Sequence, residues 1–177
     1  MSPFSPELRD LRATLQLIEN GFTETAAVVA LGERVLALRA ERVSAWSVAE
    51  QVDHLIKVEQ SILSHLLTRT PAPGPRISLA GRFVLLTGWI PRGSGTSPKR
   101  LRGLPAGQAE LTAALDACRK TLRTLAADPE PLLGPAAVLP HKMFGALTAV
   151  EALRFVPIHT RHHLLIVTDI RKSAVAR

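Results

Sequence analysis

Four stretches of the chain carry apolar residues at helical spacing, and clusters of proline and glycine separate them. The first follows Pro6, and its apolar positions include Leu8, Leu11, Leu15, Ile18 and Val29. The pattern continues to residues 35–38, although the Asn20-Gly21 pair inside it predicts a bend or a break. No stretch alternates convincingly as a strand does, so the pattern predicts an all-α protein, an antiparallel four-helix bundle.

The second helix has a clear start and a clear end. Ser47 is a suitable N-cap, and Glu50 stands three residues later, which is the capping-box arrangement. The apolar stripe comprises Val48, Val52, Leu55, Ile62 and Leu66. The proline-rich residues 70–75 cannot continue a helix, so they predict its end.

Two further helices follow in the second half of the chain. Residues 105–126 predict the third, because leucines recur there at helical spacing. The fourth is expected to begin after Gly145, with Thr148 as its cap and Glu151 at the third helical position. It is expected to run to about Arg171.

One irregular segment lies between the second and third helices. Residues 70–104 are rich in proline and glycine, and within them we expect a short helix at 79–89 and a loop at 90–98. A chain of 177 residues is long enough to bury a core as one ordinary domain. We therefore expect a single domain over residues 1–177, with this segment as an irregular crossover.

The basic charge of the chain does not point to nucleic acid. The net charge is +7 at pH 7, yet the densest basic stretch, residues 92–102, contains no interleaved aromatic residue. Nucleic-acid recognition would need a contiguous basic face. We therefore do not expect this class of partner.

Neither a signal peptide nor a membrane span is expected. Residues 1–6 lack a basic region followed by an apolar core. No apolar run approaches the ~18 residues of a transmembrane helix. The sequence therefore predicts a cytoplasmic protein without a membrane partner.

Histidine is the residue type that suggests metal chemistry. Cys118 is the one cysteine, which excludes an internal disulfide framework and a thiolate cluster. His159 and His163 are four residues apart, and two imidazoles with this spacing share a helix face and can bind one divalent ion. At about 100° per residue they lie at the border of the apolar stripe, whereas His162 points to the exposed face. Such a pair also occurs by chance on a surface, so that alternative stays open.

A third ligand would have to come from another part of the chain. The candidates are His54 and His65 on the second helix and His141 in the loop before the fourth. His54 lies well off its apolar stripe, so periodicity alone predicts an exposed polar residue. His65 follows on the same side about 16 Å further along, so His54 and His65 cannot bind one ion.

Three motifs, in this order and spacing, resemble those of one family. Residues 46–55 (WSVAEQVDHL) look like the signature W-[ST]-x-x-E-x-x-x-H-L, and residues 141–148 (HKMFGALT) look like an H-P-x-F-G-x-L-[ST] turn. Residues 154–164 (RFVPIHTRHHL) look like an R-F…H-x-x-x-H helix. Together they make the chain resemble the DinB/YfiT-like superfamily, in particular a bacterial branch of it.

The resemblance implies a fold and a ligand set. It implies up-down-down-up connectivity, with residues 70–104 as the long crossover. It also implies a divalent metal ion bound by His54, His159 and His163, and three histidines leave coordination positions open, as in catalytic sites. One departure is Ile166, where many relatives have a glutamine, so a polar neighbour that could orient a ligand is missing.

The resemblance also implies a class of function. Relatives include thiol S-transferases that use low-molecular-weight thiols, a thiol-dependent isomerase and metal-dependent hydrolases. The ion, Zn or Ni before Mn or Fe, would activate a thiol or water against a small-molecule electrophile. Wide apolar stripes favour a homodimer. The alternative is a non-catalytic metal-binding or protein-interaction helical bundle.

His141 is the candidate catalytic residue. A histidine near the start of the ligand-bearing helix can serve as an acid or base. The alternative is that His141 only fixes a turn. His65 and His162 are expected to be surface residues.

Overall fold

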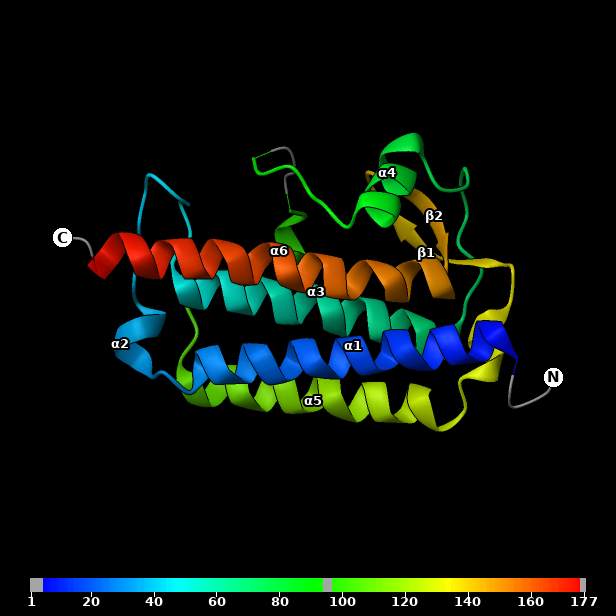
Figure 1. The fold of residues 1–177 in the computed structure, drawn as a ribbon, viewed down its shortest axis with the longest axis horizontal. Coiled ribbons are helices and arrows are strands. Elements are labelled where there is room, and N and C mark those ends of the chain that lie inside the picture. The colour runs from blue at the N-terminus through cyan, green and yellow to red at the C-terminus, as the bar shows by residue number, and fades with distance from the viewer. Residues whose placement is uncertain (1–4, 94–96, 176–177) are drawn as a thin grey trace.

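Four long helices lie side by side in the computed structural model, which describes residues 5–93 and 97–175 (Figure 1). They are α1 (Pro6–Val29), α3 (Val48–Thr68), α5 (Gln108–Ala127) and α6 (Ala149–Val175). α3 packs against α5 and α6, and α1 packs against the same two helices. Their apolar faces meet in one core, which includes Phe22, Leu63, Leu122 and Leu153.

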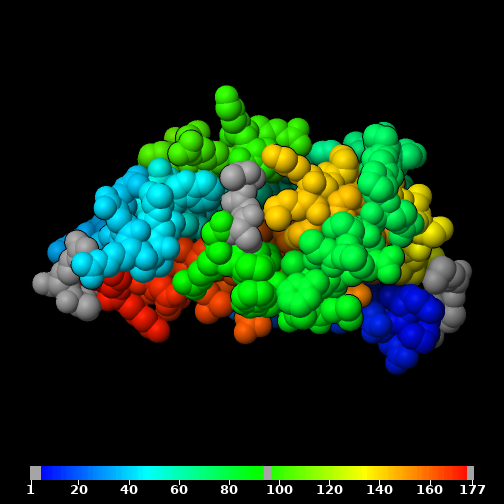
Figure 2. Space-filling model, turned by 90° about the horizontal axis from the view of Figure 1, so that it is seen from above, coloured from blue at the N-terminus to red at the C-terminus, as the bar shows by residue number. Residues whose placement is uncertain are grey.

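Shorter elements connect and cover the long helices. They are α2 (Glu33–Leu36), α4 (Leu79–Thr87), the 3₁₀ helices η1 (Lys99–Leu101) and η2 (Glu130–Leu133), and the strands β1 (Ala137–His141) and β2 (Gly145–Thr148). α4 and the two strands lie over one face of the long helices (Figure 1). Figure 2 looks onto this face, which is hollowed between the gold hairpin and the light-green segment that leads to α5.

The all-α prediction is wrong for the residues before α6, where β1 and β2 form an antiparallel hairpin. The strand register shifts between Ala137 and Leu139, so Val138 and Leu139 are both buried. A shift of this kind breaks the alternation by which a strand is recognised in a sequence. Pro140 also makes the strand hard to predict from the sequence, because proline is tolerated only where a strand needs no N–H donor.

α1 does not break at Gly21. A Cβ atom at this position would lie 3.0 Å from Thr160 Cγ2, so the glycine lets α1 approach α6 closely. The chain turns instead at Gly32, whose φ of 85° is in the left-handed region that favours glycine. Residues 35–38 therefore do not continue α1.

Two predicted helix starts are confirmed by their capping hydrogen bonds. Glu50 N–H donates to Ser47 Oγ over 3.2 Å, and Ser47 N–H donates to the Glu50 carboxylate over 2.7 Å. Thr148 and Glu151 make the same reciprocal pair over 3.2 and 2.8 Å. Each pair satisfies two N–H groups that have no partner inside the helix.

The segment between α3 and α5 crosses over α3. The short helix predicted at 79–89 is present as α4, and the predicted loop at 90–98 is described except for residues 94–96. α5 begins at Gln108 rather than at residue 105, with Gly107 as its N-cap. Gly103 lies so close to the backbone of Glu50 that a Cβ atom would overlap the Glu50 carbonyl.

The helices that the structure describes do not include a membrane span. Within residues 5–93 and 97–175, none combines the length and the apolar character that crossing a bilayer requires.

Candidate metal centre

Three histidines from two helices form one buried cluster. His54 comes from α3, and His159 and His163 come from α6; one ring nitrogen from each lies within 4.8 Å of the others. The three residues are 6%, 8% and 8% exposed. The Nε2 atoms of His159 and His163 are 3.1 Å apart. His159 and His163, predicted from their spacing, therefore lie beside His54, which the family resemblance implied.

His54 is buried although periodicity alone predicts an exposed residue. The carbonyl oxygen of Leu101 in η1 lies 2.5 Å from His54 Nδ1, and Ser97 Oγ lies 3.5 Å from the same atom. The ring of Trp46 stands 5.1 Å from the His54 ring. The crossover segment thus covers His54. A helical wheel of α3 alone does not include this segment, so it cannot predict the burial.

The histidines of the cluster are neutral near pH 7. Burial lowers the pKa of His54, and it lowers the pKa values of His159 and His163 well below the usual range. The neighbouring histidines lower the pKa values of His159 and His163 further, because charges of one sign would repel. Neutral imidazole is the form that binds a metal ion.

The hydrogen bonds around the cluster select the ring atom that can bind a metal. A carbonyl oxygen only accepts, so Leu101 places the His54 proton on Nδ1 and leaves the Nε2 lone pair free. Gln51 Oε1, 2.6 Å from His163 Nδ1, does the same for His163. The remaining histidine, His159, has a buried Nδ1 without a hydrogen-bond partner among the described residues. Two oriented imidazoles and a third beside them fit a divalent ion with nitrogen ligands.

Gln51 is a site residue that the sequence analysis missed. The departure at Ile166 predicts that one polar neighbour able to orient a ligand is missing, but Gln51 reaches His163 from α3. Gln51 lies three positions before His54, so both are on one face of α3. That spacing was the signal available in the sequence.

His141 ends strand β1, so its predicted place in a loop is wrong. Its Nδ1 accepts the N–H groups of Met143 and Phe144 over 3.3 and 3.2 Å, and its ring stacks on Phe144 with centroids 4.2 Å apart. These contacts support the turn-fixing alternative. The Phe155 ring contacts both His141 and His159, at 5.5 and 5.3 Å between centroids, so His141 lies beside the cluster.

Neither remaining histidine is fully exposed. His65 is half-buried, and its Nδ1 lies 2.8 Å from the Ser61 carbonyl oxygen one turn earlier in α3. His162 is half-buried because the segment around Ile90 lies against it, and its ring meets the His163 ring edge-on at 5.1 Å. Placing His162 on the exposed face is therefore wrong.

Glu59 is a buried acid that contacts the residue after His159. It is 0% exposed, and burial raises its pKa to about 8. Its Oε1 lies 2.6 Å from the hydroxyl of Thr160, the residue after His159. The sequence analysis missed this carboxyl. The signal available was the apolar stripe of α3, which has Leu55 and Ile62 on either side of position 59.

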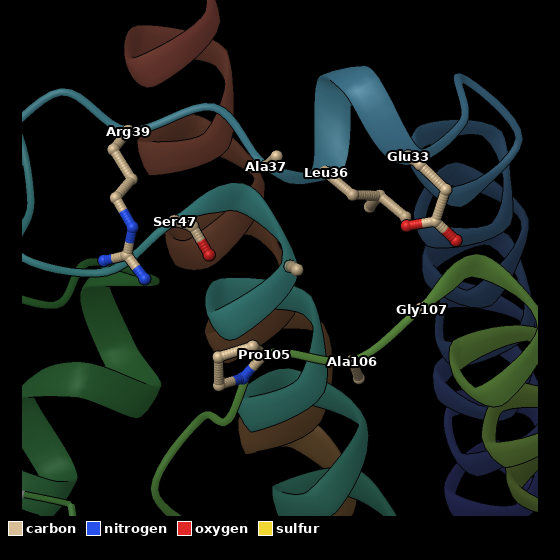
Figure 3. Close-up of a pocket in the computed structure, with 9 residues that line it drawn as sticks. Glu33, Leu36, Ala37, Arg39, Ser47, Pro105, Ala106 and Gly107 are labelled. Carbon is tan, nitrogen blue, oxygen red and sulfur yellow. The ribbon is translucent and has the colours of Figure 1, made fainter.

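A separate pocket lies where α2, the start of α3 and the segment before α5 meet (Figure 3). Its volume is about 390 Å³, and none of the three clustered histidines lines it. Its two charged side chains are engaged: Arg39 pairs with Glu50 at 2.7 Å, and Glu33 accepts the N–H of Gln108 over 2.6 Å. Both charged side chains of this pocket are thus already paired with other parts of the protein.

Comparison with known proteins supports the family resemblance. The family model described as the DinB superfamily matches residues 11–167, which include all three clustered histidines. No curated protein matches the chain significantly, and no solved structure does. The resemblance predicted from the three motifs is confirmed.

Proposed function

Since the chain belongs to the DinB superfamily, we propose that His54, His159 and His163 bind a divalent metal ion in a metal-dependent enzyme. The observation that carries this proposal is the buried cluster itself, with ring nitrogens within 4.8 Å of one another. Burying three imidazoles costs free energy unless their polar atoms find partners. A bound ion would be the common partner of three Nε2 atoms.

The donor set favours particular metals. Neutral imidazole suits Zn and Ni first, and Mn or Fe are further candidates. An ion held by three histidines keeps coordination positions open, where it would lower the pKa of a thiol or a water molecule. The proposed reaction is attack of that thiol or water on a small electrophile, as in a thiol S-transferase or a hydrolase. The thiol would be of low molecular weight.

The chain's own residues would prepare the site. Leu101 and Gln51 hold two ligand rings with Nε2 free, and burial keeps all three rings in the neutral form. His141 is the proposed catalytic acid or base. Its Nδ1 accepts backbone N–H groups, so the neutral ring carries its proton on Nε2 and can donate it.

The proposal extends to the architecture. We propose one DinB-like domain over residues 1–177, an up-down-down-up four-helix bundle, active as a cytoplasmic homodimer. The helix directions support the connectivity, because α3 and α5 both begin at the end where α1 and α6 finish (Figure 1). Apolar side chains on and beside α4 support the dimer: Leu79 is 85%, Leu86 is 84% and Trp89 is 56% exposed.

Metal content tests the proposal. Protein purified without a polyhistidine tag and without chelator should carry one Zn, Ni, Mn or Fe per chain. His159→Ala should abolish binding, whereas His65→Ala, on α3 but outside the cluster, should bind as the wild type does. A metal-free wild type that also fails to take up added Zn²⁺ would refute it. Metal binding without turnover of any thiol and electrophile pair would favour the non-catalytic alternative.

A further inference from the structure

We infer that Gln51 is a positioning residue that holds His163 in the tautomer able to bind a metal through Nε2. The inference rests on the proposed function, because it assigns a task to a residue outside the three ligands. It predicts that Gln51 affects the His163 ring even when metal is absent.

The hydrogen bond between the two side chains is short and shielded from water. Gln51 Oε1 lies 2.6 Å from His163 Nδ1, and the residues are 3% and 8% exposed. Water therefore competes poorly for either atom, and the low local dielectric strengthens the bond. A neutral imidazole has one ring proton, and an amide oxygen only accepts, so this contact places the proton on Nδ1.

A second hydrogen bond holds the other end of the Gln51 amide. Gln51 Nε2 donates to Ser44 Oγ over 2.9 Å, while Oε1 faces His163 Nδ1. Ser44 Oγ also accepts the N–H of Trp46 over 3.1 Å, and Ser44 pairs with Ala40 in an isolated bridge. The turn before α3 thus holds Ser44, Ser44 holds Gln51, and Gln51 holds His163.

Gln51 differs from the other groups around the cluster in a way that allows a test. The partner of His54 is the main-chain carbonyl of Leu101, which no substitution removes. His159 Nδ1 has no partner among the described residues. Gln51 is therefore a side chain whose removal should release the His163 ring and leave all three ligand histidines in place.

The direct test measures Zn²⁺ affinity with a competing chelator dye. Gln51→Met keeps the length of the side chain and removes the acceptor, and it should weaken binding about 10–100-fold. Gln51→Glu should restore binding, because its carboxylate accepts the same proton. Gln60→Met, on α3 but with its amide directed to Ser64 and Thr121, is the matched control and should bind Zn²⁺ as the wild type does.

A second readout is independent of metal. Ring ¹⁵N spectra of the metal-free protein should show His163 protonated at Nδ1 in the wild type. The proton should move toward Nε2 in Gln51→Met and in Ser44→Ala, a loop variant that spares the helix. An unchanged His163 spectrum together with Zn²⁺ affinity within threefold of wild type would overturn the positioning role and leave the three-histidine site intact. A wild type that shows the Nδ1 proton but binds no Zn²⁺ would instead refute the proposed function.

Discussion

Glu59→Gln should remove a large part of the pH dependence of stability. Thr160 Oγ1 lies 2.6 Å from Glu59 Oε1 and 2.9 Å from the Val156 carbonyl oxygen, and a hydroxyl has one proton to donate. Both hydrogen bonds form when Glu59 is a carboxylic acid that donates to Thr160. Its other oxygen is buried without a partner in the described part of the chain, which also disfavours the charged form.

The magnitude follows from the two pKa values of this carboxyl. The pKa rises from 4.5 to about 8 on folding, so the folded chain keeps a proton that the unfolded chain loses above pH 4.5. The contribution to stability is complete below pH 4.5 and is lost as the pH rises toward 8. Between pH 6 and 8.5 linkage predicts a loss of about 2–3 kcal/mol in the free energy of unfolding. For a domain of this size that corresponds to a fall in Tm of roughly 5–10 °C.

The assay compares the unfolding of wild type and Glu59→Gln at several pH values, with metal removed from both. The histidines titrate in both proteins, so the difference between them isolates Glu59. Gln has no proton to lose. The free energy of unfolding of the variant should therefore increase relative to that of the wild type as the pH rises. Glu24→Gln, exposed on α1, is the control for the change of residue type. A difference that stays constant from pH 6 to 8.5 would show that Glu59 does not titrate there.

Three further predictions concern single positions. Ser47→Ala removes the acceptor for Glu50 N–H at the start of α3 and should cost about 1 kcal/mol in urea unfolding. Gly145→Ala should cost more, because φ there is 81° and a Cβ atom would lie 2.6 Å from the Arg76 carbonyl oxygen; a melting temperature equal to wild type would contradict the hairpin geometry. Cys118 is 0% exposed and burial raises the pKa of its thiol to about 12, so a thiol reagent at pH 8 should label it only after unfolding.

Features that depend on neighbouring residues could be predicted from the sequence. The capping pair of Ser47 and Glu50 spans three positions, and His159 and His163 are four apart on one helix. Such short spacings fix geometry within one helical turn. The hairpin was missed because a register shift at Val138 hides the alternation on which recognition of a strand depends.

Features that depend on distant residues could not be predicted in this way. Periodicity placed His54 in solvent, because the Leu101 carbonyl that covers it belongs to the crossover and not to a packed helix. Only the family resemblance assigned His54 to the ligands. The Gln51 contact with His163 needs the relative rotation of α3 and α6, which packing of the whole core decides.

The two hydrogen bonds that orient the ligand rings have a consequence for how the protein folds. They join residues 112 positions apart, in the case of Gln51 and His163, and 47 apart, in the case of His54 and Leu101. Closing chain loops of this length costs entropy before the contacts can form, and contacts of this kind slow folding. The cluster should therefore assemble after the helices themselves. During refolding, Zn²⁺ binding should therefore recover more slowly than the helical circular-dichroism signal. The delay would measure the time that residues 70–104 need to pack against α3.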